Sequence, residues 1–527
     1  MNRDDAIDQL RDSSRTWDML VIGGGATGLG VAVDAASRGY SVALVEQSDF
    51  GKGTSSRSTK LIHGGVRYLQ QGNISLVREA LHERTILRTN APHLVRPLPL
   101  VLPTYRWGER TYYSVGLKMY DWLAGGHRME RSHWLSKDAT VAALPTINAD
   151  GLRGGVQYSD GQFDDARLLI NLAQTAAEQG AAVANHVCVT RLQIDSSGKV
   201  HGATACDEES GEELPINARV VVNATGPFVD GVRRMADAEA EKMIAPSQGI
   251  HLVLDRSFLP GDSALLVPKT SDGRVLFVIP WHTEAGGGVV LAGTTDTPID
   301  DATLEPRPQE TEIEFVLETL GQYLTKKPNR DDIRSTFAGI RPLVTRGGGG
   351  KNTSKLSRDH TIDVSTAGLL TITGGKWTTY RNMAEDCVDR AAELGDLPNR
   401  ECRTKQLKIH GYQQVEVEHA NDFGPRWYYG ADASAVNDLA QAESLDAKIH
   451  PDFPFRRADI VWAVRHEMAR TVDDILARRT RALLLDARSA IASARQVAQW
   501  MAEELNRDSA WVESQVDAFE KIAAGYK

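Results

Sequence analysis

The fold is decided by the stretch Met19-Leu20-Val21-Ile22-Gly23-Gly24-Gly25-Ala26-Thr27-Gly28, in which four apolar residues break directly into a glycine-rich turn. Residues 26–38 are predicted to continue as a helix. Gly23 suits a tight turn, Gly25 lets a pyrophosphate approach the backbone, and Gly28 permits close packing of the helix on the strand. The stretch therefore predicts a strand, a turn and a helix whose N-terminus faces the phosphates of a dinucleotide.

A second apolar strand, residues 41–45, follows this helix and ends at Glu46. An acidic residue roughly 20 positions after the glycines is placed to accept hydrogen bonds from the adenosine ribose hydroxyls. A lone glycine motif is weak evidence, but here the two strands, the turn, the helix and the acid stand in register. The unit does not distinguish FAD from NAD, because both cofactors carry the same ADP half.

Residues 53–69 read Gly-Thr-Ser-Ser-Arg-Ser-Thr-Lys-Leu-Ile-His-Gly-Gly-Val-Arg-Tyr-Leu. So long a run of small, hydroxylated and glycine residues suits a bulky cofactor lying along the backbone. The run resembles, almost residue for residue, the flavin-contacting segment of the FAD-dependent glycerol-3-phosphate dehydrogenases. Three further stretches resemble the same family, namely Val-Val-Val-Asn-Ala-Thr-Gly-Pro at 220–227, Phe-Ala-Gly-Ile-Arg-Pro-Leu at 337–343 and Gly-Gly-Lys-Trp-Thr-Thr-Tyr-Arg at 374–381. The resemblance covers essentially the whole chain and is greatest with the mitochondrial type, without its calcium-binding C-terminal extension.

The family resemblance implies an α/β fold with a Rossmann-like FAD-binding domain and an antiparallel-sheet substrate domain of the D-amino-acid-oxidase type. Strand-like runs at 250–254, 275–279 and 289–292 fit that sheet. Helical spacing of apolar residues over 457–485, 489–505 and 509–524 predicts a C-terminal helical cap domain. The expected limits are 15–85, 160–240 and 335–395 for the FAD-binding domain, 86–159 and 241–334 for the substrate domain, and 400–527 for the helical domain.

Composition narrows the class of protein further. A chain of 527 residues is too long for one core and predicts two or three domains, while 41% hydrophobic and 25% charged residues are typical of a soluble globular protein. No apolar run approaches the ~18 residues that a membrane-spanning helix needs, and residues 1–17 read as neither a signal nor a transit peptide. A net charge of -10 argues against nucleic-acid binding. We therefore expect a cytoplasmic protein, and the family resemblance implies that it is peripheral on the cytoplasmic face of the inner membrane.

The four cysteines, at positions 188, 206, 387 and 402, lack the spacing of a metal or redox motif. We expect free thiols in a reducing compartment and no metal site.

Cofactor contacts are expected along four segments of the chain. The turn at 374–379 precedes a predicted helix at 380–392, whose N-terminal amides suit the negative N1/O2 edge of a reduced flavin; an ordinary helix cap at Thr378 or Thr379 is the alternative. The glycine motif and the resemblance together assign the FAD to Gly23, Gly25, Ala26, Thr27, Gly28, Glu46, Thr54, Ser55, Ser56, Lys60, His63, Gly64, Gly65, Ala224, Thr225, Gly226, Gly375, Lys376 and Thr378.

A phosphorylated substrate beside a flavin needs cationic groups with planar or multiple donors. The resemblance implies that Arg341, Arg358 and Lys376 contact the substrate and that Tyr68 belongs to the same pocket. Taken by themselves, these residues read equally well as surface ion pairs or turn residues. Arg341 and Lys376 are also expected to take part in catalysis.

The hydroxyl proton of the substrate needs a base, and His251, on an alternating strand, aligns with a histidine of the family's site. An imidazole that titrates near neutral pH suits this task. A buried hydrogen-bonding histidine is the alternative reading. His63 is a rival for the base, although a structural or flavin-ring contact suits it better, and the role of Arg67 stays open.

The resemblance implies an enzyme that oxidises sn-glycerol 3-phosphate to dihydroxyacetone phosphate by hydride transfer to FAD and passes the electrons to a membrane quinone. An oxidase that uses oxygen and a flavin-binding protein without turnover are the alternatives, while the segment 54–68 disfavours a nicotinamide dehydrogenase. A homodimer is one assembly that the sequence leaves open. Residues 347–350, all glycine, read either as a lid or as a plain surface loop.

Basic residues gather in the C-terminal part of the chain, and two interpretations of them stay open. One is a membrane-surface footprint, and the other is a solvated helix face salt-bridged to Asp459, Glu467, Asp473 and Asp474. The residues concerned are Arg456, Arg457, Arg465, Arg470, Arg478, Arg479 and Arg481.

Overall fold

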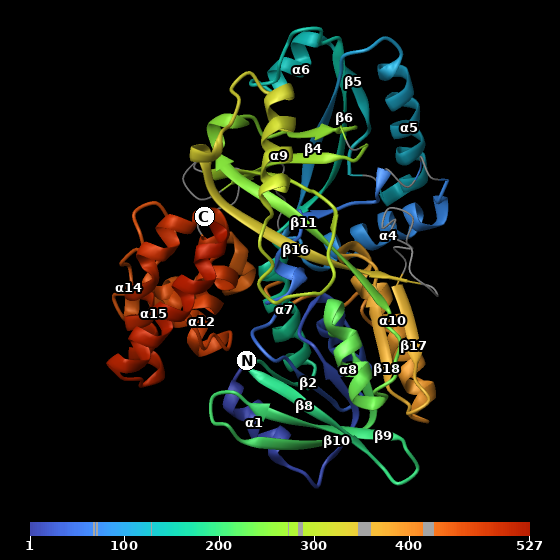
Figure 1. Ribbon diagram of the computed structural model, residues 1–527, viewed down its shortest axis with the longest axis vertical. Helices are drawn as coiled ribbons and strands as arrows, with labels where there is room; N and C mark the ends of the chain where they lie inside the picture. Colours follow the sequence, from blue (N-terminus) through green and yellow to red (C-terminus); the bar gives the residue numbers. More distant parts are fainter. Residues whose placement is uncertain are drawn as a thin grey trace.

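The structure is a computed structural model that describes residues 1–66, 69, 72–127, 129–271, 273–282, 288–345, 360–414 and 426–527. Tyr68, Arg67, Arg358 and the glycines at 347–350 lie outside these residues. The described part contains two sheets, one below the other in Figure 1, with the C-terminal helices packed to one side.

The first sheet carries the dinucleotide motif. Five of its strands are parallel in the order β18-β10-β1-β2-β7, with β17 antiparallel at one edge and the hairpin β8-β9 pairing with β10. The strands are β1 (Thr16–Ile22), β2 (Val42–Val45), β7 (Ala182–Ala184), β8 (Val187–Ile194), β9 (Val200–Asp207), β10 (Glu213–Asn223), β17 (His360–Val364) and β18 (Leu370–Gly374). The apolar runs of β1 and β2 are buried almost throughout, as continuous runs in parallel strands usually are.

Helices pack against this sheet in the manner of a dinucleotide-binding fold. The helix α2 (Ala26–Ser37) follows β1 and packs against α7 (Asp165–Glu178) and α10 (Tyr380–Leu394), whereas α1 (Arg3–Arg11) lies against β7 and β10. Since β1 and β2 run parallel, with Ile22 opposite Val45, the glycine turn and Glu46 emerge at the same edge of the sheet. The motif therefore forms the predicted unit.

The second sheet is the larger one and is antiparallel except where β4 pairs with β12. Its strands are β3 (Leu61–Ile62), β4 (Val95–Thr104), β5 (His133–Leu135), β6 (Gly154–Phe163), β11 (Ile244–Asp255), β12 (Ala264–Val267), β13 (Leu276–His282), β14 (Gly288–Gly293), β15 (Thr297–Pro298) and β16 (Ile333–Val344). The helices around it are α4 (Ile74–Asn90), α5 (Glu109–Ala124), α6 (Lys137–Ala143) and α9 (Glu310–Tyr323), whereas α8 (Val229–Ala236) packs against β8, β10 and β18 of the first sheet. The expected strands at 250–254, 275–279 and 289–292 lie in β11, β13 and β14.

Two strands of this sheet fall in segments that we had assigned to the FAD-binding domain. β16 pairs with β11 over almost its whole length, and β3 pairs with β6. The prediction followed the flavin-family motifs, which lie on these strands, but their backbone hydrogen bonds go to the substrate sheet. The flavin motifs thus lie at the junction of the two sheets.

The expected continuous helix at 457–485 is wrong. The structure has α12 (Arg457–His466), a π-helical turn (Asp474–Arg479) and α13 (Ala482–Leu485). Met468 and Arg481 have φ values of 56° and 60°, so the chain leaves the helical conformation at both residues. The pieces retain apolar residues at helical spacing, which is why the periodicity does not reveal the breaks.

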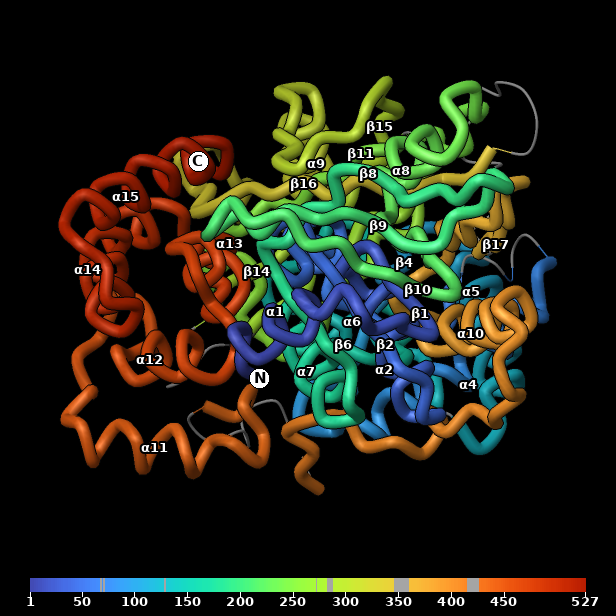
Figure 2. Tube along the Cα trace, turned by 90° about the horizontal axis from the view of Figure 1, so that it is seen from below, coloured from blue at the N-terminus to red at the C-terminus, as the bar shows by residue number. Residues whose placement is uncertain are grey.

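The remaining C-terminal helices are α11 (Ala433–Ala442), α14 (Ala487–Leu505) and α15 (Ser509–Ala523). Figure 2 shows them gathered on one side of the sheets. One cluster of buried apolar side chains runs from the first sheet into these helices, and a second fills the space between the large sheet and α9. In the part of the chain that the structure describes, no helix has both the length and the apolar character needed to cross a bilayer.

Candidate active site

A cavity of about 360 Å³, here called the nucleotide cavity, opens at the carboxyl ends of the parallel strands. Dinucleotides bind at this edge in open α/β sheets. The expected cofactor residues that line it are Gly23, Gly25, Ala26, Thr27, Glu46, Thr54, Ser55, Ala224, Thr225, Gly226, Gly375 and Lys376. Segments far apart in sequence thus converge on one cavity.

The glycine turn leaves no room for side chains. A Cβ on Gly23, where φ is +111°, would lie 2.8 Å from the carbonyl oxygen of Ala224, and one on Gly28 would lie 1.9 Å from the carbonyl oxygen of Gly23. Gly28 does not line the cavity but packs the helix against the turn. At both glycines the close neighbour is the backbone of the protein itself, so the packing of the turn requires glycine there.

Glu46 both lines the cavity and holds the turn. Its Oε2 accepts a hydrogen bond from the amide of Gly24 at 2.7 Å, and its Oε1 accepts one from the amide of Ser48 at 2.9 Å. Burial raises the pKa of the carboxyl group, while these two amides act to lower it. Each carboxylate oxygen keeps lone pairs for a further donor.

The segment that resembles the flavin contacts is tied to three other elements. The Thr54 hydroxyl donates to the carbonyl of Ile340 in β16 at 2.6 Å, and the indole of Trp377 donates to the carbonyl of Ser55 at 2.8 Å. The hydroxyl of Ser55 in turn accepts from the amide of Ala26 at 3.0 Å. These bonds hold the segment rigidly along the cavity wall.

A second cavity of about 610 Å³, here called the large cavity, adjoins the first. Ser58 and Pro342 line the nucleotide cavity, whereas their chain neighbours Thr59 and Arg341 line the large one, so the two meet along these residues. His63 and Gly65, two expected cofactor residues, also line the large cavity. Its walls are mainly apolar, with Leu61, Val66, Leu69, Leu100, Leu102, Leu266, Val275 and Phe277 among them.

Arg341 lies at the polar end of the large cavity. Its Nη2 donates to the hydroxyl of Thr294 at 3.1 Å and to the carbonyl of Thr295 at 3.0 Å, and its Nη1 lies 3.4 Å from Asp296. Arg274 donates to the carbonyl of Asp296 at 2.5 Å and lines the same cavity. The sequence did not point to Arg274, because nothing in its spacing places it beside a residue 67 positions away. The Nη2 atom of Arg274 lies 4.0 Å from the carboxylate of Asp296, so two guanidinium groups flank one carboxylate at this end.

His251 does not line either cavity, but it contacts the hydroxyl of Thr59, which lines the large cavity. Its Nε2 is 3.0 Å from the hydroxyl of Thr59, and its ring stacks on Phe337 at 4.8 Å between centroids. Burial, followed by the charges of Lys60 and Arg341, lowers the pKa of His251 to about 3. The imidazole is therefore neutral at neutral pH, as a base must be. Its titration lies far below neutral pH, unlike the expected titration near neutral pH.

Four expected cofactor residues support the cavity walls instead of lining them. The amide of Gly64 donates to the hydroxyl of Tyr120 at 2.8 Å, and the hydroxyl of Thr378 accepts from the amide of His63 at 3.2 Å. Lys60 is buried, and its ammonium group donates to Asp165 and to the carbonyl of Ser56, both at 2.6 Å. Ser56 is itself buried away from both cavities.

The turn before α10 is not capped as the alternative reading expected. Thr379 occupies the capping position, but its hydroxyl hydrogen-bonds the carbonyl of Lys376 at 3.3 Å instead of an amide of the helix. The first turn of the helix therefore keeps its amides near the lining residues Gly375 and Lys376.

The C-terminal arginines form ion pairs within the protein, as the interpretation of a salt-bridged helix face expects. Three of the expected partners take part, since Arg478 pairs with Asp473 and Asp474 and Arg479 pairs with Glu467. Other carboxylates outside the expected set also take part. Arg465 pairs with Glu443 and Glu504, Arg470 with Glu209, Arg457 with Glu503, Arg481 with Asp164, and Arg478 and Arg479 with Asp49. Arg456 donates to the carbonyl of Asp446. Charges neutralised in this way offer little to an anionic surface.

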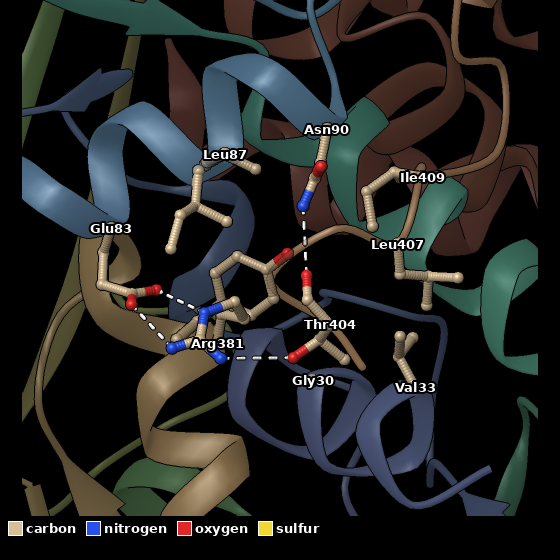
Figure 3. A pocket seen from close by; sticks show the side chains of 11 residues that line it. Gly30, Val33, Glu83, Leu87, Asn90, Arg381, Thr404, Leu407 and Ile409 are labelled. Carbon is tan, nitrogen blue, oxygen red and sulfur yellow. Dashed lines mark hydrogen bonds and ion pairs between the residues drawn. The ribbon is translucent and has the colours of Figure 1, made fainter. Parts of the chain in front are cut away.

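A small pocket between α2, α4 and α10 is structural (Figure 3). Arg381 forms a two-point ion pair with Glu83, with both contacts at 2.7 Å, and also donates to the hydroxyl of Thr404 at 3.3 Å. With about 10 Å³ of free space, the pocket holds at most one water. The ion pair fastens α10 to α4.

The glycine turn, the acid at the end of β2 and the adjoining cavity on an antiparallel sheet define an FAD-dependent oxidoreductase of the D-amino-acid-oxidase type. The family model "FAD dependent oxidoreductase" matches residues 18–381, and "C-terminal domain of alpha-glycerophosphate oxidase" matches residues 370–512. The nucleotide cavity fits FAD, because the glycine turn, the N-terminus of α2 and Glu46 line it together.

Relatives define the family more closely. The chain is 42% identical to the mitochondrial glycerol-3-phosphate dehydrogenase of Arabidopsis thaliana, over 93% of this chain and 83% of that protein. It is also 42% identical to a probable mitochondrial glycerol-3-phosphate dehydrogenase of Caenorhabditis elegans, over 95% and 72%. The crystal structure of the Bacillus halodurans glycerol-3-phosphate dehydrogenase with FAD matches with a TM-score of 0.78 at 29% identity, over 99% of this chain and 97% of that one. The chain belongs to the FAD-dependent glycerol-3-phosphate dehydrogenase family.

Proposed function

We propose that this enzyme oxidises sn-glycerol 3-phosphate at C2 to dihydroxyacetone phosphate and passes the electrons to a membrane quinone. The observation that carries the proposal is the place of Arg341, where the polar end of the large cavity meets the nucleotide cavity. A substrate phosphate held there leaves the rest of a small polyol at the junction of the two cavities. Bound FAD supplies the hydride acceptor at its N5 atom.

The proposed phosphate site combines the planar guanidinium group of Arg341 with that of Arg274. The two Nη atoms of Arg341 are held by Thr294, Thr295 and Asp296. Arg274 adds a second guanidinium beside the same carboxylate. A guanidinium oriented in this way binds a phosphate with little further loss of side-chain freedom. Lys376, which lines the nucleotide cavity, extends the positive charge toward the cofactor.

The proton of the C2 hydroxyl passes through Thr59 to His251. With its own proton on Nδ1, the neutral imidazole accepts at Nε2 from the Thr59 hydroxyl, 3.0 Å away. The Thr59 hydroxyl faces the large cavity and can accept the substrate proton in the same movement. Since burial keeps this imidazole neutral at neutral pH, no deprotonation of His251 has to precede the transfer.

The membrane contact is assigned to α5 in place of the C-terminal arginines. Tyr112, Val115, Met119 and Trp122 recur on one face of this helix and are 61%, 64%, 40% and 77% exposed. The first three also line the large cavity. An apolar helix face that continues into an apolar cavity suits entry of a quinone from the lipid.

Anaerobic spectroscopy tests the proposal. Glycerol 3-phosphate should bleach the bound FAD, glycerol should do so far more slowly because it lacks the phosphate, and a short-chain quinone should restore the colour without oxygen. Stoichiometric hydrogen peroxide in air, with no effect of the quinone, would favour the oxidase. FAD that binds but is never bleached would leave only a flavin-binding protein.

A further inference from the structure

Cys188 and Cys206 face each other across the hairpin β8-β9. They are direct partners in the antiparallel register, so their side chains lie on the same face of the hairpin. Opposed residues of this kind have Cα atoms about 4.5 or 5.5 Å apart and Cβ atoms about 4.5 to 5.5 Å apart. A disulfide requires a distance of about 4.4 to 6.8 Å between the Cα atoms and about 3.5 to 4.5 Å between the Cβ atoms. The backbone therefore fits a disulfide once the two Cβ atoms approach by about 1 Å.

Both thiols are free and half-buried, which leaves them within reach of small reagents. Cys188 Sγ lies 3.8 Å from the carbonyl oxygen of Val189, and Cys206 Sγ lies 3.7 Å from that of Asp207. Contacts of this length are weak, so little is lost when the sulfur atoms turn toward each other. Cys402 differs, because its thiol donates to the buried carboxylate of Asp34 at 3.0 Å.

The pair adjoins the cofactor. Cys188 lines the nucleotide cavity between Val187 and Val189, which line it as well. The amide of Val187 donates to the carbonyl of Glu46 at 2.8 Å, so this end of the hairpin is joined directly to the end of β2. A bond between the two cysteines would fasten the wall that the hairpin contributes to the cavity.

We propose that Cys188 and Cys206 form a reversible cross-strand disulfide that slows the release of FAD. The oxidant is a low-molecular-weight disulfide. The thiolate of one cysteine attacks it and releases one thiol, and the other cysteine then attacks the mixed disulfide and releases the second. The protein loses two hydrogens and two electrons, and the reagent is reduced to two thiols.

The charges around the pair set the rate of this exchange. Burial and then the carboxylate of Glu208 raise the pKa of both thiols, and Glu46 acts on Cys188 while Asp207 and Glu213 act on Cys206. The thiolate is the reacting form. Formation should therefore be slow at neutral pH and should accelerate about tenfold for each pH unit while the pH stays below the pKa of the thiols.

The test treats the holoenzyme with oxidised glutathione at pH 8.5 and then counts thiols and measures the intact mass. We expect the loss of two thiols, a mass decrease of about 2 Da, a cross-linked peptide joining the two strands, and full reversal by dithiothreitol. The control Cys402→Ser should behave like the parent enzyme. A stable glutathione adduct on either cysteine, or unchanged thiols, would overturn the disulfide.

The effect on the cofactor is measured separately, by the rate at which FAD appears outside the protein during dilution. Oxidation should slow this release about threefold or more, because a cross-linked wall opens less readily. In the double variant Cys188→Ser/Cys206→Ser the oxidant should leave the rate of FAD release unchanged, because neither thiol remains to exchange with it. Equal release from oxidised and reduced parent enzyme would refute the role in FAD retention even if the disulfide forms.

Discussion

Replacement of His251 by Gln tests the proton path most directly. The variant keeps a neutral hydrogen-bonding side chain near Thr59 but removes the basic nitrogen. A positioned base contributes about 100-fold to 10,000-fold, so anaerobic reduction of the flavin by glycerol 3-phosphate should slow by that factor. FAD should stay bound, because His251 lines neither cavity.

The pH profile supplies the second half of this prediction. With a pKa of about 3, only about one His251 in 10,000 is protonated at pH 7. The second-order rate constant for flavin reduction should therefore lack an ascending limb from His251 between pH 5 and 9. If His251 were exposed to solvent, the rate of flavin reduction would instead rise with pH around the usual histidine pKa of about 6.5.

Stopped-flow spectroscopy without oxygen measures both quantities. Thr59→Val removes the intervening hydroxyl and should cost a similar factor, and the double variant should be little slower than either single one, because the two groups act in one path. Reduction within threefold of the parent rate in the Gln variant would refute the base. A limb near pH 6.5 that disappears in that variant would refute the reasoning from burial.

Three further predictions concern the phosphate site, the membrane contact and stability. Arg341→Lys keeps the charge but loses the fork, so KM for glycerol 3-phosphate should rise about tenfold or more in steady-state assays; an unchanged KM would place the phosphate elsewhere. Trp122→Glu should weaken sedimentation with anionic liposomes, whereas Arg465→Glu, in a residue already paired within the protein, should not; the opposite order would restore the basic footprint. Hydrogen bonds to two carboxylates outweigh burial and raise the pKa of His410 to about 9, above its usual value near 6.5. Its contribution of roughly 2 to 3 kcal/mol is therefore complete below pH 6.5 and lost as the pH rises through 9. Denaturant unfolding should show a loss of stability over that range that is absent in His410→Asn.

The cofactor half of the site could be predicted from the sequence because its signals are local. The glycine turn, Glu46 and the residues after Gly53 follow one another in the chain. The role of each could be predicted from the residues next to it. The position of the Lys60 ammonium group could not be predicted in this way, since a lysine in a cofactor segment gives no sign that its partner is Asp165, far along the chain.

The substrate half depends on pairings over long distances in the chain. Arg274 and Arg341 meet only because their strands share a sheet and both reach Asp296. The burial of His251 follows from stacking on Phe337 in the neighbouring strand. No spacing in the sequence carries either fact, and the low pKa of His251 could not be anticipated from an alternating strand.

The ion pairs around the loop after Glu46 bear on how the molecule melts. Asp49 is held by Arg478 and Arg479, and Lys52 by Asp473, with every carboxylate and cation of the group largely withdrawn from water. Detaching the C-terminal helices would break these pairs and would also expose the cluster of buried apolar side chains that runs from the first sheet into the helices. The helices and the dinucleotide fold therefore unfold together, in a single calorimetric transition that added FAD shifts as a whole, and limited proteolysis should not yield a stable flavoprotein fragment that lacks them.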